Sequence, residues 1–458
     1  MLIEIILNGK KENCRGYKIV YFLRLYFIIS LIGYFILGNS ALANLYEKKI
    51  VSDIVMPKYF FTDKVNESCK MKKDSNEFYS NSLFTEFDLS KKSNYSWLAK
   101  LKDYSWVKDH AKRSDSLDVF FHQLTDRMEY LYATLTNSII DGTIDIQANK
   151  AIDLMVSWAE AEIIMDTTSV QQIKDMIKSG SFSSCYQGKG KEGAKCYWHA
   201  AQEAARYAGQ FNISANLVKP YMNDKERELI ENYLDSMYKK YIQPWYVTSG
   251  AGDKSIDHGF YQMGHGAISV LAYAHWKNDK KLAIYAFKTA MKHINALILE
   301  GGFINNNSFR GVRGYWYHGT ALNNMLAMVA LAEKYNFPVN DKIYNKLTDA
   351  VNFMDRDAKE YLTWLESLPR KKSFSNGKVY LKYNNKNIYV GNASWKHKNA
   401  RNYMKSSAVF LDYLSETYTK GQINRERKEY KVFNYKRKKT GLGVSDQELG
   451  FNPTCIHR

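Results

Sequence analysis

The sequence predicts an all-α protein built from helical hairpins, and three observations support this fold class. The chain of 458 residues is 45% hydrophobic and 24% charged, which are the values of a folded globular protein with a sizeable core. It holds 6 prolines against 35 tyrosines and 9 tryptophans, and its turn signals have no regular spacing, which disfavours a β-sandwich or barrel. Beyond about residue 90, apolar residues recur at the three- and four-residue steps of amphipathic helices.

The first 43 residues are typical of a secretory signal peptide. A basic region ends at Arg24, the apolar run Leu25–Leu37 follows, and small residues precede a cleavage site after Ala43. The run is shorter than the roughly twenty residues of a spanning helix, although extension back to Ile19 leaves a signal anchor open. Cleavage would remove five basic and two acidic residues, lowering the net charge from +18 to +15. We expect a periplasmic or secreted protein with no further apolar stretch able to span a membrane.

Helices are predicted in order along the chain from about residue 152. The spacing predicts them at residues 152–163, 198–211, 223–243, 258–276, 280–299, 317–335 and 341–353. The second carries a stripe of alanines suited to close packing. The third opens with Asn223 and has Glu226 three residues on, a capping-box signal, and we expect Pro244 to end it. Short connections predict antiparallel neighbours, and the series indicates a toroid or a solenoid of helix pairs, without the fixed period of a regular solenoid.

Two segments near the C-terminus depart from the helical pattern. Residues 378–390 alternate apolar and polar side chains around Asn384-Asn385, which predicts a small β-hairpin. Residues 420–439 hold nine basic and two acidic residues, typical either of a solvated tail or of an arm that contacts anions. The predicted organisation is a signal peptide at 1–43, one helical domain at 44–415 and a basic tail at 416–458. The basic excess indicates an acidic partner or serves solubility.

The cysteines do not predict a metal site. After signal cleavage four remain, Cys69, Cys185, Cys196 and Cys455, and an even number in an exported protein permits disulfides. Cys185 and Cys196 flank a loop rich in Gly and Lys, so a bridge between them is our first hypothesis among three possible pairings. No Cys-x-x-Cys or paired Cys/His spacing occurs. We therefore expect neither a metal nor a cofactor.

The densest polar and aromatic cluster runs from Asn305 to His318, between two predicted helices. Loops on a rigid scaffold are where functional side chains concentrate. About 50 residues upstream, Asp257-His258 opens another helix, with Tyr261 on the same face one turn later. Tyr, His and Arg side chains together can transfer protons beside a bound anion.

These segments follow the motif order of a known family. Glu300–Ile304, Arg310, Tyr317-His318 and the apolar stretch Met325–Ala332 are similar to its Arg-rich stretch and to the Tyr-His-Asn-Tyr run before an apolar helix. Further matches are Lys254–His258 to Lys-x-Ile-Asn-Asn-His, Val156–Ala161 to Trp-Ala-x-Ala, Trp198–Ala200 to a third helix and, weakly, Phe61–Lys64 to Phe-Thr-x-Lys. In these residues the chain resembles the periplasmic alginate lyases, poly(β-D-mannuronate) lyases with an incomplete α/α toroid fold.

The resemblance implies β-elimination at a uronic acid. The C5 proton is barely acidic until the neighbouring carboxylate is neutralised, so a cation or strong hydrogen-bond donors must meet that carboxylate. The family pattern assigns Arg310 to this task and to activating Tyr317, the general acid that also could serve as base. His258 is the neutral base or a carboxylate ligand. The substrate-binding candidates are Asp257, Tyr261, Arg313, Lys64 and His318. The implied partner is alginate or another polyuronate, and we expect a monomer.

Two departures from the family pattern keep a second hypothesis open. Asp257 stands where the family has Asn, and an ionised Asp would repel a substrate carboxylate; Tyr261 stands where the family has Trp. The alternative is therefore a non-catalytic binding protein that guides an anionic exopolysaccharide during export. A toroidal glycoside hydrolase would need a second carboxylate opposite Asp257, for which the sequence offers no convincing candidate. The export signal disfavours nucleic-acid binding.

Overall fold

The structure is a computed structural model, and its described residues belong to two compact units, residues 1–54 and 55–458. The described residues are 50–58, 60, 128, 131, 132, 135, 138, 139, 142–160, 162, 198–248, 260–305, 307, 308, 314–354, 378–383 and 386–392. In the first unit these are residues 50–54, where the Ile54 N–H donates to the Ile50 carbonyl at 3.0 Å. Everything below concerns the second unit.

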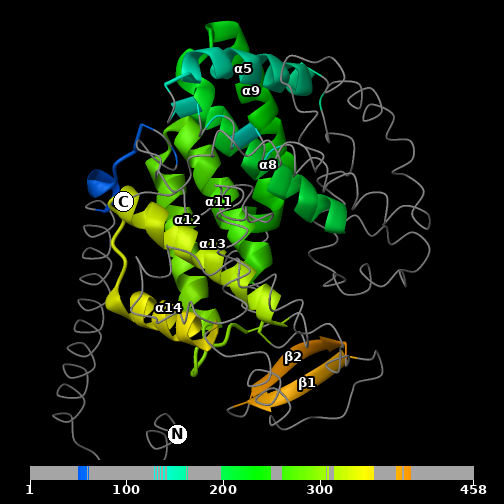
Figure 1. Ribbon diagram of the computed structural model, residues 1–458, viewed down its shortest axis with the longest axis vertical. Helices are drawn as coiled ribbons and strands as arrows, with labels where there is room; N and C mark the ends of the chain where they lie inside the picture. Colours follow the sequence, from blue (N-terminus) through cyan, green and yellow to red (C-terminus); the bar gives the residue numbers. More distant parts are fainter. Residues whose placement is uncertain are drawn as a thin grey trace, which may run out of the picture. The chain divides into compact units, whose positions relative to one another are not determined.

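The described part of the second unit is mostly helical, which confirms the predicted fold class at this level (Figure 1). Its α-helices are α5 (Ile144–Glu160), α8 (Trp198–Val218), α9 (Asp224–Met237), α11 (Phe260–Lys277), α12 (Lys280–Leu297), α13 (Gly314–Lys334) and α14 (Asp341–Met354). A short 3-10 helix, η4 (Lys219–Tyr221), follows α8, and a π-helix, η5 (Tyr238–Thr248), follows α9. Each predicted helix corresponds to one of these, with shifted ends.

The α9 segment confirms one prediction and overturns another. The Asn223 side chain accepts from the Glu226 N–H at 3.0 Å, and the Glu226 carboxylate accepts from the Asn223 N–H at 2.9 Å, which completes the capping box. The prediction that Pro244 ends the helix is wrong, because η5 continues through it to Thr248. At Tyr238 the backbone changes from i→i+4 to i→i+5 bonding. Pro244 therefore lies inside η5 and does not end the helical segment.

Helices α8 and α11 run side by side in the same direction. A side chain at Gly209 would meet Ser269, the Asn216 amide donates to the Ala272 carbonyl at 3.0 Å, and the Lys219 ammonium donates to the Trp276 carbonyl. Since residue numbers rise together along this interface, the two helices are parallel. Helix α9 runs against them, because its Asp235 accepts from the Tyr273 hydroxyl at 2.6 Å while the earlier Glu231 pairs with Lys277.

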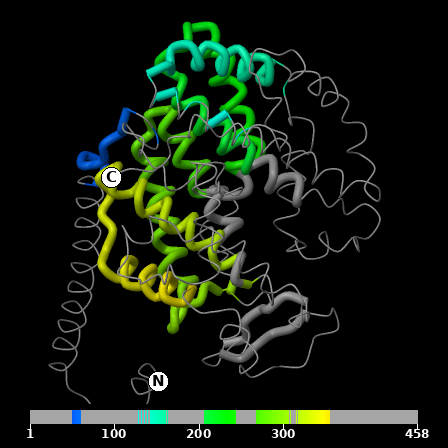
Figure 2. The backbone as a smooth tube through the Cα atoms, in the orientation of Figure 1, coloured from blue at the N-terminus to red at the C-terminus, as the bar shows by residue number. Residues whose placement is uncertain are grey.

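Helices α12, α13 and α14 continue the alternation (Figures 1 and 2). The Tyr335 hydroxyl, just past α13, contacts His275 near the end of α11, so α11 and α13 are parallel. Phe287 of α12 packs on Tyr335 with ring centroids 5.4 Å apart, and His318 at the start of α13 contacts Ala350 near the end of α14. Helices α12 and α14 are therefore antiparallel to α13.

The described helices fall into two sets by direction. Helices α8, α11 and α13 are neighbours that share one direction, with α11 in contact with both others, while α9, α12 and α14 run the opposite way. Every residue from Tyr317 to Ala332 of α13 is buried, as expected for a helix covered on all sides. Helix α12, by contrast, has an exposed face. The polar start of α13 is thus fixed within a well-packed scaffold.

The hairpin expected at residues 378–390 is present in the backbone. Strands β1 (Lys378–Tyr383) and β2 (Lys386–Asn392) pair antiparallel, with Tyr383 opposite Lys386 and Tyr380 opposite Tyr389. The register shifts between Lys378 and Tyr380. The predicted basic tail at 416–458, the signal peptide at 1–43 and the four cysteines lie outside the described residues. No helix among the described residues is long and apolar enough to cross a membrane.

Candidate functional site

Tyr317, the predicted general acid, lies in the first turn of α13. The helix begins at Gly314, three residues earlier than predicted, and Tyr317 is buried, with 9% of the residue's accessible surface remaining. Its backbone carbonyl accepts a hydrogen bond from the Asn307 amide at 3.2 Å. The first turn of a helix also carries unpaired N–H groups and a partial positive charge. This position therefore favours negative charge that develops close to the start of α13.

The turn between α12 and α13 is held by its own backbone. Ile298 and Ile304 form an antiparallel bridge, and the Asn305 N–H donates to the Leu297 carbonyl at 2.9 Å. Gly302 has a φ of +81°, and a Cβ there would overlap the backbone carbonyl of Asp349 in α14. Glycine is needed for both reasons, since it tolerates this φ and leaves room for the neighbouring backbone. The turn therefore lies directly against α14.

His318 joins this turn to α14 through both ring nitrogens. Its Nδ1 lies 2.8 Å from the Ser308 hydroxyl, and its Nε2 lies 2.9 Å from the Ala350 carbonyl. A carbonyl only accepts, so Nε2 carries the proton and Nδ1 accepts from the Ser308 hydroxyl. The Ser308 oxygen in turn accepts from the Ile304 N–H at 2.7 Å. Each of these hydrogen bonds thus has one donor and one acceptor, and the tautomer of His318 is assigned from this hydrogen-bond network.

The His318 ring is neutral in the folded protein. It is fully buried and stacks on Phe353 at 4.7 Å between ring centroids. Desolvation lowers the pKa of His318 to about 3, and the hydrogen bond to Ala350 only partly opposes this. Both ring nitrogens are engaged, and the residue has no exposed surface. The described contacts of His318 are thus with Ser308, Ala350 and Phe353. That His318 binds substrate stays a prediction.

The structure describes only part of the predicted site. Tyr317 and His318 are adjacent, as described above, and Tyr261 lies in the first turn of α11. The remaining candidates lie outside the described residues: Lys64, Asp257, His258, Arg310 and Arg313. The predicted convergence of His258 and Arg310 on Tyr317 therefore stays a prediction.

Asn307 and Ser308 are the residues whose role the sequence did not reveal. Both are buried completely, and both hold the first residues of α13. They belong to the polar cluster noted in the sequence, but composition alone did not separate supporting side chains from reacting ones. The sequence spacing is a signal of this support: Asn307 lies ten residues before its partner Tyr317, and Ser308 lies ten residues before its partner His318.

No metal site is present among the described residues. Within that part of the chain, no three His, Cys, Asp or Glu side chains come together in a way that could hold an ion. Neither a protein-family model nor a curated protein sequence matches this chain.

Proposed function

We propose that the protein is a polysaccharide lyase that cleaves alginate, or a related polyuronate, by β-elimination. The observation that carries the proposal is the placement of Tyr317, which the resemblance to the alginate lyases singles out. This tyrosine is a buried residue in the first turn of α13, and the Asn307 amide donates to its backbone carbonyl. Fixed geometry of this kind is what proton transfer requires, because a misplaced acid or base loses most of its effect.

The proposed reaction assigns one task to each side chain. Arg310 neutralises the C5 carboxylate, so that the C5 proton becomes acidic enough to remove. Tyr317 protonates the 4-oxygen as the glycosidic bond breaks, and either Tyr317 or neutral His258 takes the C5 proton. In mannuronate both events occur on one face of the ring, which lets closely spaced groups share them. Asp257, Tyr261, Arg313 and Lys64 are proposed substrate contacts, with Arg313 as the substitute for Arg310.

We further propose that the helices form an incomplete α/α toroid. What supports this is the alternation of direction, with α8, α11 and α13 parallel in one layer and α12 and α14 antiparallel in the other. Repeated pairing of an inner with an outer helix produces such an arc. In this arrangement Tyr317 opens an inner helix. We also propose that the mature protein is exported and monomeric, in agreement with its signal-like N-terminus.

The lyase reaction is tested with three polymers. Polymannuronate, polyguluronate and glucuronan are incubated with the protein, and the unsaturated sugar produced by elimination is followed by ultraviolet absorbance. Cleavage of at least one polymer is expected. If none is cleaved but polymannuronate binds, the non-catalytic binding protein replaces the lyase. If none is cleaved or bound, the polyuronate assignment fails as well.

The role of Tyr317 is tested by Tyr317→Phe, which removes only the hydroxyl. Loss of a general acid is expected to lower kcat about 10²–10⁴-fold while the unfolding midpoint stays close to that of the wild type. Tyr344→Phe is the matched control, because it removes a phenol that donates to Glu333 at 2.6 Å, between α14 and the end of α13. Wild-type kcat in Tyr317→Phe would refute the assignment.

A further inference from the structure

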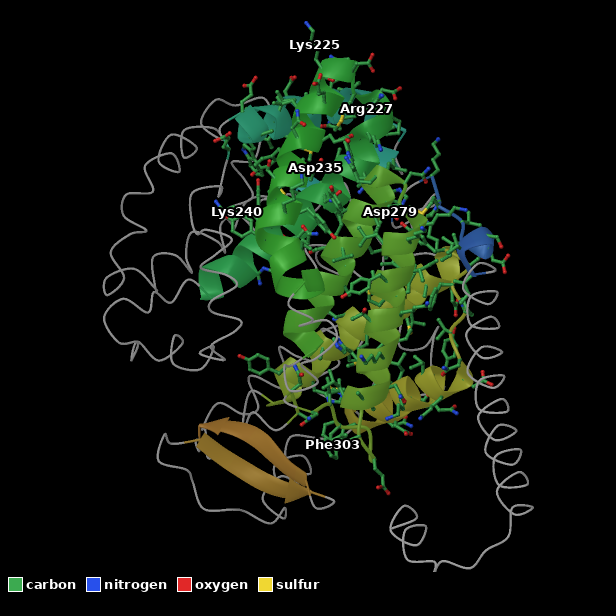
Figure 3. All side chains as sticks on the ribbon, turned by 180° about the vertical axis from the view of Figure 1, so that it is seen from behind. Lys225, Arg227, Asp235, Lys240, Asp279 and Phe303 are labelled. Carbon is green, nitrogen blue, oxygen red and sulfur yellow. The ribbon has the colours of Figure 1, made fainter. Side chains whose placement is uncertain are left out.

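The start of α13 is closed by aromatic rings on the side of α14. The His318 ring stacks on Phe353 of α14 with centroids 4.7 Å apart, and Phe303, labelled in Figure 3, lies against the same ring at 6.5 Å. Ser308 and Ala350 contact the two nitrogens of His318. On this side the helix start is held by rings and by paired polar atoms.

The side of α13 turned away from α14 carries buried polar side chains instead. At about 100° per residue, Thr320 and Asn324 lie roughly 200° and 240° around the helix from His318. Both residues are completely buried. The Asn324 amide nitrogen donates to the Thr320 backbone carbonyl at 3.2 Å, so the Asn324 side chain is folded back toward Thr320. The polar groups of these two residues therefore lie within one turn of the helix.

Among the described residues, two oxygen atoms of this pair have no hydrogen-bond partner. These are the Thr320 hydroxyl oxygen and the Asn324 amide oxygen. By contrast, the Thr348 hydroxyl of α14 donates to the Tyr344 carbonyl of its own helix at 2.9 Å. Buried polar atoms in folded proteins nearly always have a partner, which is either a protein group or an ordered water. The two oxygens therefore indicate a site for a small polar ligand.

We infer that Thr320 and Asn324 hold one ordered water molecule inside the fold. Residues four apart on a helix have their Cβ atoms about 5–6 Å apart, a gap that two hydrogen bonds of about 2.8 Å through one water span. The Asn324 amide oxygen accepts from the water, and the Thr320 hydroxyl either donates to it or accepts from it. Because neither residue is exposed, a sugar has no access to the site, whereas buried water is a regular constituent of folded proteins.

The water site lies one turn beyond Tyr317. Tyr317 precedes Thr320 by three residues, so both lie on the same side of α13. The water therefore joins the packing around the helix turn that carries the candidate general acid, on the side away from α14. The site is a property of the fold and does not depend on the lyase reaction.

The inference is tested by Thr320→Val in the full chain, which removes the hydroxyl and keeps the shape of the side chain. If the hydroxyl holds a water, its loss leaves the water and the Asn324 oxygen with fewer partners, and the urea midpoint of unfolding is expected to fall by about 0.3–0.5 M. A hydroxyl without a water would be an unpaired buried group, and its removal would raise the midpoint. Thr348→Val is the matched control, because its half-buried hydroxyl already donates to the Tyr344 carbonyl, and its midpoint is expected to stay within about 0.2 M of the wild type.

A crystal structure of the wild-type protein tests the site without any variant. One water is expected within about 3.2 Å of both the Thr320 hydroxyl oxygen and the Asn324 amide oxygen, and it is expected to be missing from the crystal structure of Thr320→Val. The inference is overturned if the wild type shows no density between these atoms, or if the midpoint of Thr320→Val rises or falls no further than that of the control. If Thr320→Val does not fold, the wild-type density alone decides. Neither measurement involves cleavage, so failure of the lyase reaction leaves the water site standing, and the reverse also holds.

Discussion

At the scale of single residues, the start of α13 depends on contacts that differ in kind from reacting groups. His318 is buried and neutral, and Ser308 and Ala350 occupy its two nitrogens. His318 directly follows a candidate catalytic tyrosine in the sequence. Its hydrogen bonds to Ser308 and Ala350, however, are contacts within the fold. Removal of the ring would leave the Ala350 carbonyl and the Ser308 hydroxyl buried without these partners, which is costly. These contacts therefore fix the start of α13 against α14.

Gly302 provides a direct test of this local architecture. Gly302→Ala adds a Cβ that overlaps the Asp349 carbonyl at a φ of +81°, and is expected to lower the free energy of unfolding by about 2–4 kcal/mol. Gly142→Ala is the control, because its φ is +68° but no atom lies within 4 Å of the added Cβ. It is expected to cost about 1 kcal/mol. Urea unfolding measures both, and equal costs would show that the contact with α14 contributes nothing.

At the scale of elements, the end of α8 shows what a periodic pattern misses. The sequence predicted this helix to end at residue 211, but it continues to Val218. Polar residues at 212, 214 and 216 interrupt the apolar stripe, so the apolar periodicity predicts no helix beyond residue 211. They are buried nevertheless, and the Asn216 amide donates to Ala272 of α11. A polar side chain that is satisfied by a neighbouring helix cannot be distinguished from an exposed one by hydropathy.

The close approach of α8 and α11 can be tested at one contact. Gly209→Ala is expected to destabilise the fold by about 1–3 kcal/mol, because its Cβ would overlap the Ser269 hydroxyl. Ser269→Ala in the same chain removes that oxygen and should restore part of the loss, since the Ser269 Cβ remains 3.0 Å from the added carbon. Chemical unfolding of both single variants and the double variant measures the coupling. Strictly additive effects would contradict this packing.

At the scale of the whole molecule, the sequence predicts the order and class of the elements well and the contacts of the site poorly. Helices appear wherever one apolar stripe repeats, as in α12 and α14, because burial of that stripe determines the element. The surroundings of His318 depend on Ala350, 32 residues away, and no local spacing encodes that pairing. Helix α13 is buried on all sides, so no polar face in its sequence shows which side chains meet a neighbour.

A half-buried histidine, His275, joins distant parts of the chain. The Nδ1 atom of His275, near the end of α11, lies within hydrogen-bond distance of the Tyr335 hydroxyl at 2.6 Å, and Phe60 lies edge-on to the His275 ring at 5.6 Å. The Val55 N–H donates to the Tyr335 carbonyl at 3.0 Å, so Val55 and Phe60 both lie beside Tyr335. Burial, assisted by the positive charges of Lys219 and Lys334, lowers the pKa of His275 to about 3.

Acid should therefore destabilise the fold through His275 and His318 together. Each has a pKa of about 3 when folded and about 6.5 when unfolded, so the unfolded chain binds more protons between these values. Their contribution to stability is complete above pH 6.5 and falls by about 1.4 kcal/mol per pH unit for each histidine as the pH approaches 3.

His275→Gln keeps an acceptor for Tyr335 but cannot titrate. Between pH 6 and 4, the unfolding free energy of this variant should fall less steeply than that of the wild type, by about that slope. Parallel curves in urea unfolding would mean that His275 is protonated in the folded protein, and its burial beside Phe60 and Tyr335 would then be wrong.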